Sequence, residues 1–320
     1  MPRVSIVIPA WRAAAYIGAA IESALRQSFT DYEILVVNDG SPDTAELERV
    51  LEPYRQRITY ILRENGGPAA ARNTAIRAAR GHLIGLLDAD DLWEPEFLAV
   101  QVAVLDRDPD ADAVYADARI VGESSEAGRT FMSRWPSRGA VTLERVIRHE
   151  CSVVACATLV RREAVLRAGM FDESLRGTED MDLWLRILRQ GGKIVYQHRV
   201  LASYRRHRGS LSADPAASSR GFLDVLDKFR QLPDLSAAER SLIEQQHVLE
   251  TAMLNLHTGK QAFFAGDFDA ATRHLRLANT RLKSFKVTLV IALLRIAPDM
   301  LRRAYRFRDR FIYKVNTEFD

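Results

Sequence analysis

Two groups of carboxylates stand where they could bind a cation or accept a proton. In the first group, Asp88-Ala89-Asp90, with Asp91 beside it, follows the apolar run Leu83–Leu87. Two carboxylates at the end of a strand can turn toward one ligand, and Mg²⁺ or Mn²⁺ prefers oxygen ligands. A cation bound to a diphosphate needs only one or two of them. The alternative is an aspartate-rich turn that caps the next helix.

The second group, Glu179, Asp180 and Asp182, lies at the start of an amphipathic stretch that ends at Gln190. Carboxylates in the first turn of a helix cap its N–H groups and interact with its dipole, worth about 1 kcal/mol. A carboxylate in a cleft can also accept a proton from a hydroxyl. Both roles are compatible, and spacing leaves open which of the three faces a cleft.

The elements that must position these groups alternate along the first half of the chain. We expect strands at Val4–Ile8, Glu33–Asn38, Thr59–Leu62 and Leu83–Leu87, and helices at Ala14–Gln27, Thr44–Tyr54 and Pro68–Ala79. This order predicts a doubly wound α/β sheet with right-handed crossovers, in which ligands bind beyond the carboxyl ends of the strands. Polar or turn-forming clusters follow all four strands, at Pro9-Ala10, Asn38–Ser41, Glu64–Gly67 and Asp88–Asp91.

The chain changes character after the first four strands. Residues 113–208 mix expected strands with helices, and after Ser210 helical periodicity runs nearly to the end. The segment Gly266–Ala271 is similar to the turn of a helical hairpin, and it occurs once. We therefore predict an α/β region followed by an α-helical extension.

Composition excludes several classes of protein. The chain has 320 residues, 47% of them hydrophobic and 27% charged, which is typical of a soluble globular protein and not of a disordered one. The net charge of +3 is too small to indicate a nucleic-acid partner. Cys151 and Cys156 are expected to be buried thiols in a reducing compartment. The first strand is too short for a secretory signal, so we expect the cytosol.

The C-terminal segment is strongly basic. From Arg281 to Lys314 it carries ten basic residues against Asp299 and Asp309, so the rest of the chain is mildly acidic. Its apolar stretch, Val287–Ala297, is too short to span a bilayer, which needs about twenty residues. An apolar stretch beside cationic residues predicts a helix on the cytoplasmic face of an anionic membrane. The alternative is a helix packed on the protein, and nucleic-acid binding is not expected because no recognised module accompanies the charge.

Eight blocks of sequence follow one another between residues 3 and 210. They are Val4–Ala10, Ala20–Ser28, Glu33–Ser41, Glu64–Asn73, Asp88–Asp91, Gly169–Glu173, Thr178–Trp184 and Tyr204–His207. In these blocks and in their order the chain resembles the family 2 glycosyltransferases. The resemblance implies a GT-A-type doubly wound mixed sheet flanked by helices, here with an α-helical C-terminal extension. It also implies inverting transfer from a nucleotide sugar, with UDP the expected nucleotide, and a requirement for Mn²⁺ or Mg²⁺.

The same resemblance implies roles for individual residues. Asp39 would bind the edge of the base, and Arg72 would lie near the base or the diphosphate. Asp88 would contact the ribose or the metal, Asp90 would bind the metal, and His207 would complete the metal shell or contact the diphosphate. Pro9, Ala10 and Ala89 would line the nucleotide-sugar site. Asp180 would be the general base, with Glu179 as its rival, since an inverting transfer needs a base for the acceptor hydroxyl.

These inferences define the expected domains and partners. Residues 1–212 would form the catalytic domain, with a nucleotide-sugar-binding half at 1–115 and an acceptor half at 116–212, and residues 213–320 the helical region. The acceptor would be a hydroxyl of a surface-glycan or lipid-linked precursor. One alternative is a sugar-phosphate nucleotidylyltransferase, against which the glycine-free segment Pro9–Ala14 argues. Another is a non-catalytic membrane adaptor that kept the fold.

Overall fold

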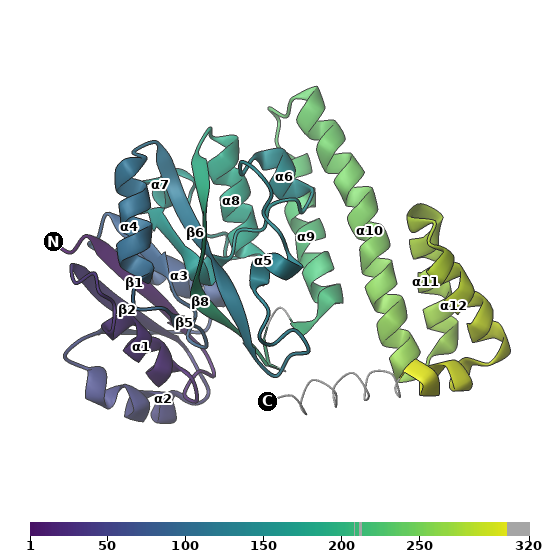
Figure 1. Cartoon of the computed structure of the whole chain (residues 1–320), viewed down its shortest axis with the longest axis horizontal. Coiled ribbons are helices and arrows are strands. Elements are labelled where there is room, and N and C mark those ends of the chain that lie inside the picture. Colours follow the sequence, from purple (N-terminus) through teal and green to yellow (C-terminus); the bar gives the residue numbers. More distant parts are fainter. Residues whose placement is uncertain (208, 211–212, 306–320) are drawn as a thin grey trace. The chain divides into compact units, whose positions relative to one another are not determined.

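The structure is a computed structural model, and it describes residues 1–207, 209–210 and 213–305. The chain divides into two compact units, residues 1–208 and 209–320 (Figure 1). The first unit holds all the strands that the structure describes, and the second consists of helices. The expected α/β region with a helical C-terminal region is therefore confirmed.

The first unit is built on one mixed sheet of eight strands, in the order β3-β2-β1-β4-β7-β6-β8-β5. The strands are β1 (Val4–Ala10), β2 (Tyr32–Asp39), β3 (Thr59–Arg63), β4 (Leu83–Leu86), β5 (Leu92–Trp93), β6 (Ala111–Gly122), β7 (Thr158–Arg161) and β8 (Lys193–Arg206). The first four run parallel as predicted, because β1 pairs with both β2 and β4, and β2 pairs with β3. Strand β7 is antiparallel to β4 and β6, and β8 runs parallel to β6.

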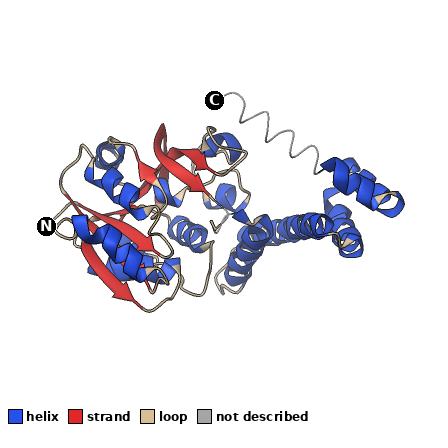
Figure 2. Ribbon diagram, turned by 90° about the horizontal axis from the view of Figure 1, so that it is seen from below, coloured by secondary structure: helices blue, strands red, loops and turns tan. Residues whose placement is uncertain are grey.

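Helices cover both faces of this sheet (Figure 2). One buried cluster joins the sheet to α1 (Ile17–Leu25), α2 (Thr44–Leu51) and α4 (Phe97–Arg107). The other joins it to α3 (Pro68–Ala78), α7 (Arg162–Arg167) and α8 (Glu179–Arg189). Along β1, Ile6 and Ile8 enter the first cluster and Val7 the second, as expected for side chains that alternate along a strand. The short elements η1 (Glu52–Tyr54), α5 (Phe131–Arg134), α6 (Leu143–Ile147) and η2 (Ala155–Ala157) lie in the connections.

The strand directions place several chain ends at one edge of the sheet. Because β7 is antiparallel to both β4 and β6, β6 and its parallel neighbour β8 run in the same direction as β4. The residues that follow β1, β2, β4, β6 and β8 therefore leave the sheet at the same edge. Asp90 of the DAD motif and His207 come together there, although they are 117 residues apart in sequence.

Several element boundaries differ from expectation, among them the start of α1 and the length of β6. Helix α1 begins at Ile17 and not at Ala14, because Tyr16 has a φ of −122°, which lies outside the helical region. Strand β6 is twelve residues long, and it runs without a break through residues 115 and 116. The two expected halves of the catalytic domain therefore share one strand.

The second unit contains α9 (Pro215–Arg230), α10 (Ala237–Ala265), α11 (Phe268–Leu282) and α12 (Phe285–Ile296). The hairpin turn expected at Gly266 is present, since α10 ends there with a φ of 93° in the left-handed region that glycine adopts readily. Ser236 and Glu239 form a capping box at the start of α10. Within the described residues, no helix combines the length and the apolar character needed to cross a bilayer.

Candidate active site

Arg72 connects the two groups of carboxylates that the sequence singles out. It lies on the buried face of α3, which begins at Pro68 directly after the positive-φ residue Gly67. Its Nη2 lies 2.6 Å from Asp88 Oδ1, and its Nη1 lies 2.7 Å from Glu179 Oε1. Burial opposes the charge, but the two carboxylates outweigh it and raise the pKa of Arg72. The end of β4 is thereby joined to the start of α8.

The three carboxylates on α8 have different surroundings. Glu179 is buried, and its second oxygen accepts the backbone N–H of Gly177 at 2.6 Å. Asp182 is completely buried and held by Arg186, whose Nη2 lies 2.6 Å from Asp182 Oδ2. Asp180 is partly exposed and accepts the backbone N–H of its neighbour Met181 at 2.8 Å. Both of its rivals are thus held by guanidinium groups.

The surroundings of Asp180 also favour proton transfer near neutral pH. The pKa of Asp180 is raised to about 7. The largest cause is burial, which shields the carboxylate from water, and the negative charge of Glu179 adds to the shift, whereas Arg72 opposes it. A group with this pKa is ionised in part of the population at pH 7 and holds a proton well once it has taken one. Asp180 is therefore suited to act as a base.

Asp90 and His207 form a second contact at the same edge of the sheet. Asp90 Oδ2 lies 3.1 Å from His207 Nε2, and the ring of Tyr16 stacks on the imidazole at 5.2 Å between centroids. Both side chains are partly exposed. A carboxylate and an imidazole are suitable ligands for Mn²⁺, and neighbouring ligands of an octahedral cation with bonds of about 2.1 Å lie about 3 Å apart.

These residues fit a divalent cation, although they do not by themselves form a complete metal site. Among the described residues, no group of three or more His, Cys, Asp and Glu side chains is arranged to hold a metal ion. Asp88, the third predicted ligand, is engaged with Arg72 instead. A cation at Asp90 and His207 would therefore need oxygen atoms of a diphosphate and water as further ligands.

Asp91 has a positioning role that the sequence reasoning missed. It is buried, and its Oδ1 accepts the backbone N–H of Arg205 at 2.6 Å. The Nε of Arg205 donates to the backbone oxygen of Asp90 at 2.8 Å. These two bonds hold the end of β8, and with it His207, beside Asp90. Asp91 adjoins the DAD motif in sequence, but its partner is 114 residues away, so no local signal indicated the contact.

We expect Asp91→Ala to weaken Mn²⁺-dependent binding of UDP by about 10- to 100-fold, the usual effect of losing a group that supports a metal ligand. Asp91→Asn should stay within about threefold of wild type, because its amide oxygen can still accept the Arg205 N–H. Titration calorimetry with and without Mn²⁺ measures both, and binding without metal should be the same in both variants. Equal affinities for the alanine variant and wild type would remove Asp91 from this role.

Asp39 lies at the end of β2, and its carboxylate is already engaged. The backbone N–H of Gly67 donates to Oδ2 at 2.7 Å, that of Gly66 to Oδ1 at 3.1 Å, and Arg63 Nη1 lies 3.0 Å from Oδ1. The segment after β3 lies close to the end of β2 because residue 40 is a glycine: a Cβ there would lie 2.7 Å from the backbone nitrogen of Asn65. A nucleobase N–H would have to share the carboxylate with Arg63 or displace it.

The other predicted donor-site residues lie at the same sheet edge. Ala10 and Ala89 are buried and Pro9 is partly exposed, so these residues shape the backbone more than they offer side chains. Trp11, which we did not single out, follows Ala10 and exposes half of its indole. The sequence feature that could have indicated Trp11 is the position of an aromatic residue directly after a strand. Cys151 and Cys156 are both buried free thiols, as expected.

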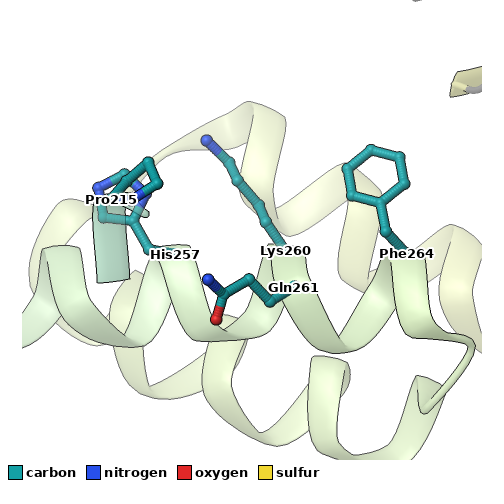
Figure 3. Close-up of a pocket in the computed structure, with 5 residues that line it drawn as sticks. All are labelled: Pro215, His257, Lys260, Gln261 and Phe264. Carbon is teal, nitrogen blue, oxygen red and sulfur yellow. The ribbon is translucent and has the colours of Figure 1, made fainter. Parts of the chain in front are cut away.

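A separate pocket lies in the helical unit (Figure 3). It is lined by Pro215 at the start of α9 and by His257, Lys260, Gln261 and Phe264 of α10. The four α10 residues recur every three or four positions and share one face of that helix. Gln261 Nε2 donates at 2.6 Å to Oδ1 of Asp214, the N-cap residue of α9. All five lining residues belong to the second unit, whereas the candidate active site is formed in the first.

Comparison with known proteins agrees with this architecture. The profile of Glycosyl transferase family 2 matches residues 5–169. The UDP-Glc:alpha-D-GlcNAc-diphosphoundecaprenol beta-1,3-glucosyltransferase WfgD of Escherichia coli is 30% identical over 232 residues, which cover 72% of this chain and 87% of WfgD. An uncharacterized glycosyltransferase of Rickettsia typhi is 32% identical over 213 residues. The chain spans 64% of the length of that relative and 34% of a similar one from Rickettsia felis.

Two solved structures share the fold. Residues 1–349 of S. aureus TarS superpose with a TM-score of 0.61 at 18% identity, covering 95% of this chain and 91% of that one. The mannosyltransferase PcManGT from Pyrobaculum calidifontis, in complex with GDP-Man and Mn²⁺, gives a TM-score of 0.61 at 18% identity and covers 99% and 86%. The fold is thus that of the GT-A class of glycosyltransferases. From the profile match and the identity to WfgD, the chain belongs to glycosyl transferase family 2.

Proposed function

We propose that this protein transfers a sugar from a nucleoside-diphosphate sugar to a hydroxyl of a glycan or lipid-linked acceptor, with inversion at the anomeric carbon. The observation that carries the proposal is the pair of ion pairs made by Arg72, which bring the DAD motif next to Glu179 and Asp180. In this proposal, the nucleotide sugar binds at the DAD motif, and the base lies close enough to act on an acceptor bound beside it. UDP is the expected nucleotide, and TarS has been solved with UDP-GlcNAc.

The proposed reaction assigns a separate task to each group. Asp180 takes the proton of the acceptor hydroxyl as its oxygen forms a bond to the anomeric carbon, while the bond from that carbon to the diphosphate breaks on the opposite face. Asp90 and His207, with Asp88 nearby, would hold a Mn²⁺ or Mg²⁺ that offsets the charge of the leaving diphosphate. Arg72 keeps Asp88 and Glu179 in place and adds positive charge beside them.

The proposed acceptor follows from the relatives. WfgD is named for a diphosphoundecaprenol acceptor, which is lipid-linked. We propose the same class of acceptor here, with the protein acting as a peripheral protein on the cytoplasmic face of a membrane. Residues 1–212 would be the catalytic domain, with the donor bound mainly by residues 1–115 and the acceptor by 116–212. Family membership argues against a nucleotidylyltransferase, and the adaptor hypothesis is left to experiment.

A thermal-shift screen across UDP-, GDP- and dTDP-sugars, with and without Mn²⁺, tests the proposal. A ligand that binds the native state raises its stability by about 2.7 kcal/mol at 100 times its Kd, so the cognate donor should raise the Tm clearly. UDP-sugars with Mn²⁺ should give the largest shift. If none of these nucleotide sugars changes the Tm, the proposed donor class is contradicted and the adaptor hypothesis is favoured. The anomeric configuration of a product, measured by NMR, tests inversion.

A further inference from the structure

Helix α12 is apolar on two opposite faces, and within the described residues only one of them packs against other helices. Leu294 is buried, and Val287, Val290 and Ile291 pack with it against Phe263 of α10 and residues of α11. This cluster fixes α12 within the helical unit. The alternative of a helix packed on the protein therefore describes one face of this segment.

The opposite face of α12 exposes large apolar side chains. Phe285 is 79% exposed, Leu289 49% and Ile296 81%, and Ala292 between them is also exposed. At about 100° per residue, these four side chains fall within about 60° of the helix circumference. They form a continuous stripe, called here the α12 stripe. Soluble monomers seldom expose large contiguous apolar patches, so the α12 stripe indicates a contact surface.

Positive charge surrounds the α12 stripe. Lys286 and Arg295 are exposed about 100° and 80° from the position of Phe285, one on each side. Further basic residues precede and follow the helix, and Asp299 is the one acidic residue between positions 281 and 305. The basic residues in this range are Arg281, Lys283, Lys286, Arg295, Arg302 and Arg303. The segment has a net charge of +5, and its apolar stripe is itself uncharged.

We propose that the α12 stripe docks on an anionic lipid bilayer, lying in the interface without crossing it. Apolar side chains would enter the boundary between headgroups and acyl chains, and Lys286 and Arg295 would contact the anionic headgroups. A second copy of the chain is a poorer occupant, because the two segments would bring like charges of +5 together. The proposal rests on the proposed function in one respect, since a lipid-linked acceptor would be met in the same membrane.

Point substitutions test this better than truncation. Removing α12 would also uncover the cluster around Phe263, Ala271 and Leu275, so loss of binding could reflect damage to the fold. The double variant Leu289→Glu with Ile296→Glu changes only the exposed stripe. Its matched control is Leu277→Glu on α11, which is 56% exposed. Leu277 lies about 200° around α11 from Asn279, whose side chain bonds to Thr288 of α12, so it points away from α12.

Co-sedimentation of the full-length chain with vesicles measures the effect. Wild type should bind vesicles of phosphatidylcholine with 30% phosphatidylglycerol, should bind pure phosphatidylcholine weakly, and should be released as salt shortens the screening length. We expect the double variant to bind at least about tenfold more weakly, because each buried carboxylate adds both charge repulsion and desolvation. Leu277→Glu should remain within about twofold. If the double variant unfolds, Ile296→Glu alone, at the most exposed position of the stripe, serves as the test.

Each remaining outcome would overturn the proposal. One such outcome is wild-type protein that stays in the supernatant, and another is a double variant that binds vesicles as tightly as wild type does. The proposal also fails if Leu277→Glu loses as much vesicle binding as the double variant, or if wild type is a dimer that dissociates in the double variant. A chain ending at Tyr305 separates the stripe from residues 306–320, which lie outside the described part and include Arg306, Arg308, Arg310 and Lys314. That chain should still bind, and its failure to bind would assign the contact to the tail. Stabilisation by UDP and Mn²⁺, measured on every variant, separates failure of docking from failure of the proposed function.

Discussion

Asp180→Asn should lower kcat by about 100-fold or more while the Kd of the donor stays within about threefold of wild type. Removing a general base slows the step in which the proton moves, and an asparagine of nearly the same shape leaves donor binding unaffected. The contacts support this choice, because Glu179 is bound by Arg72 and Asp182 by Arg186, whereas Asp180 is partly exposed. Steady-state kinetics with a competent acceptor, together with titration of UDP, measures both quantities.

The pH dependence provides a second readout of the same prediction. The base must be ionised to accept a proton, so kcat/KM of the wild-type enzyme should rise with pH and level off above an apparent pKa of about 7. Asp180→Asn should lose this rise. Glu179→Gln is the comparison variant, with its Tm measured because it breaks the contact to Arg72. If Glu179→Gln lost the pH dependence and Asp180→Asn kept it, the roles of the two residues would be exchanged.

Asp90→Ala should reduce Mn²⁺-dependent binding of UDP by about 100-fold or more and leave the Tm of the free protein nearly unchanged. The carboxylate is partly exposed and lies 3.1 Å from His207, so its loss removes a charged ligand without opening a buried cavity. The magnitude is that of losing a direct ligand, which exceeds the 10- to 100-fold cost of losing a supporting group. Titration calorimetry with and without Mn²⁺ measures it.

A matched control for this variant is available at the other edge of the sheet. Asp110 is exposed directly before β6, and Asp110→Ala should bind UDP with Mn²⁺ as wild type does. His207→Ala should fall between the two, since an imidazole contributes one neutral ligand. Affinity in Asp90→Ala equal to that in the control would place the cation elsewhere.

The sheet could be predicted from the sequence because its signals are local. The apolar runs at Val4–Ile8 and Leu83–Leu87 mark buried strands, and each is followed by a cluster that the parallel order brings to one edge. The start of α1 differs from the prediction, because no local signal indicates the non-helical φ of −122° at Tyr16. The length of β6 has no local signal, because its later part, residues 116–122, is held as a strand by pairing with β8.

The candidate site was predictable in residue type but not in contacts. The DAD motif and the carboxylates of α8 could be selected by pattern, yet their connection through Arg72 joins residues 107 positions apart. The choice among Glu179, Asp180 and Asp182 depends on which guanidinium groups reach them. The i,i+4 spacing of a helix can indicate the pair of Asp182 and Arg186, but no local pattern indicates that Arg72 binds Glu179. The same holds for α12, whose exposed apolar face can be recognised only after Val287 and Leu294 are seen to pack inward.

The pairing of β6 with β7 and β8 determines where the junctions of a chimaeric protein should lie. Tyr115 pairs with Thr158 at the last rung of the ladder between β6 and β7, whereas residues 116–122 pair with β8 up to Gly122 and Arg206. A graft of 116–157 from a homologue would therefore bring a strand edge that must fit the recipient's β8. A graft restricted to residues 123–157 would keep every rung of both ladders. Libraries that exchange the segment between β6 and β7 should place their junctions after Gly122 and before Thr158.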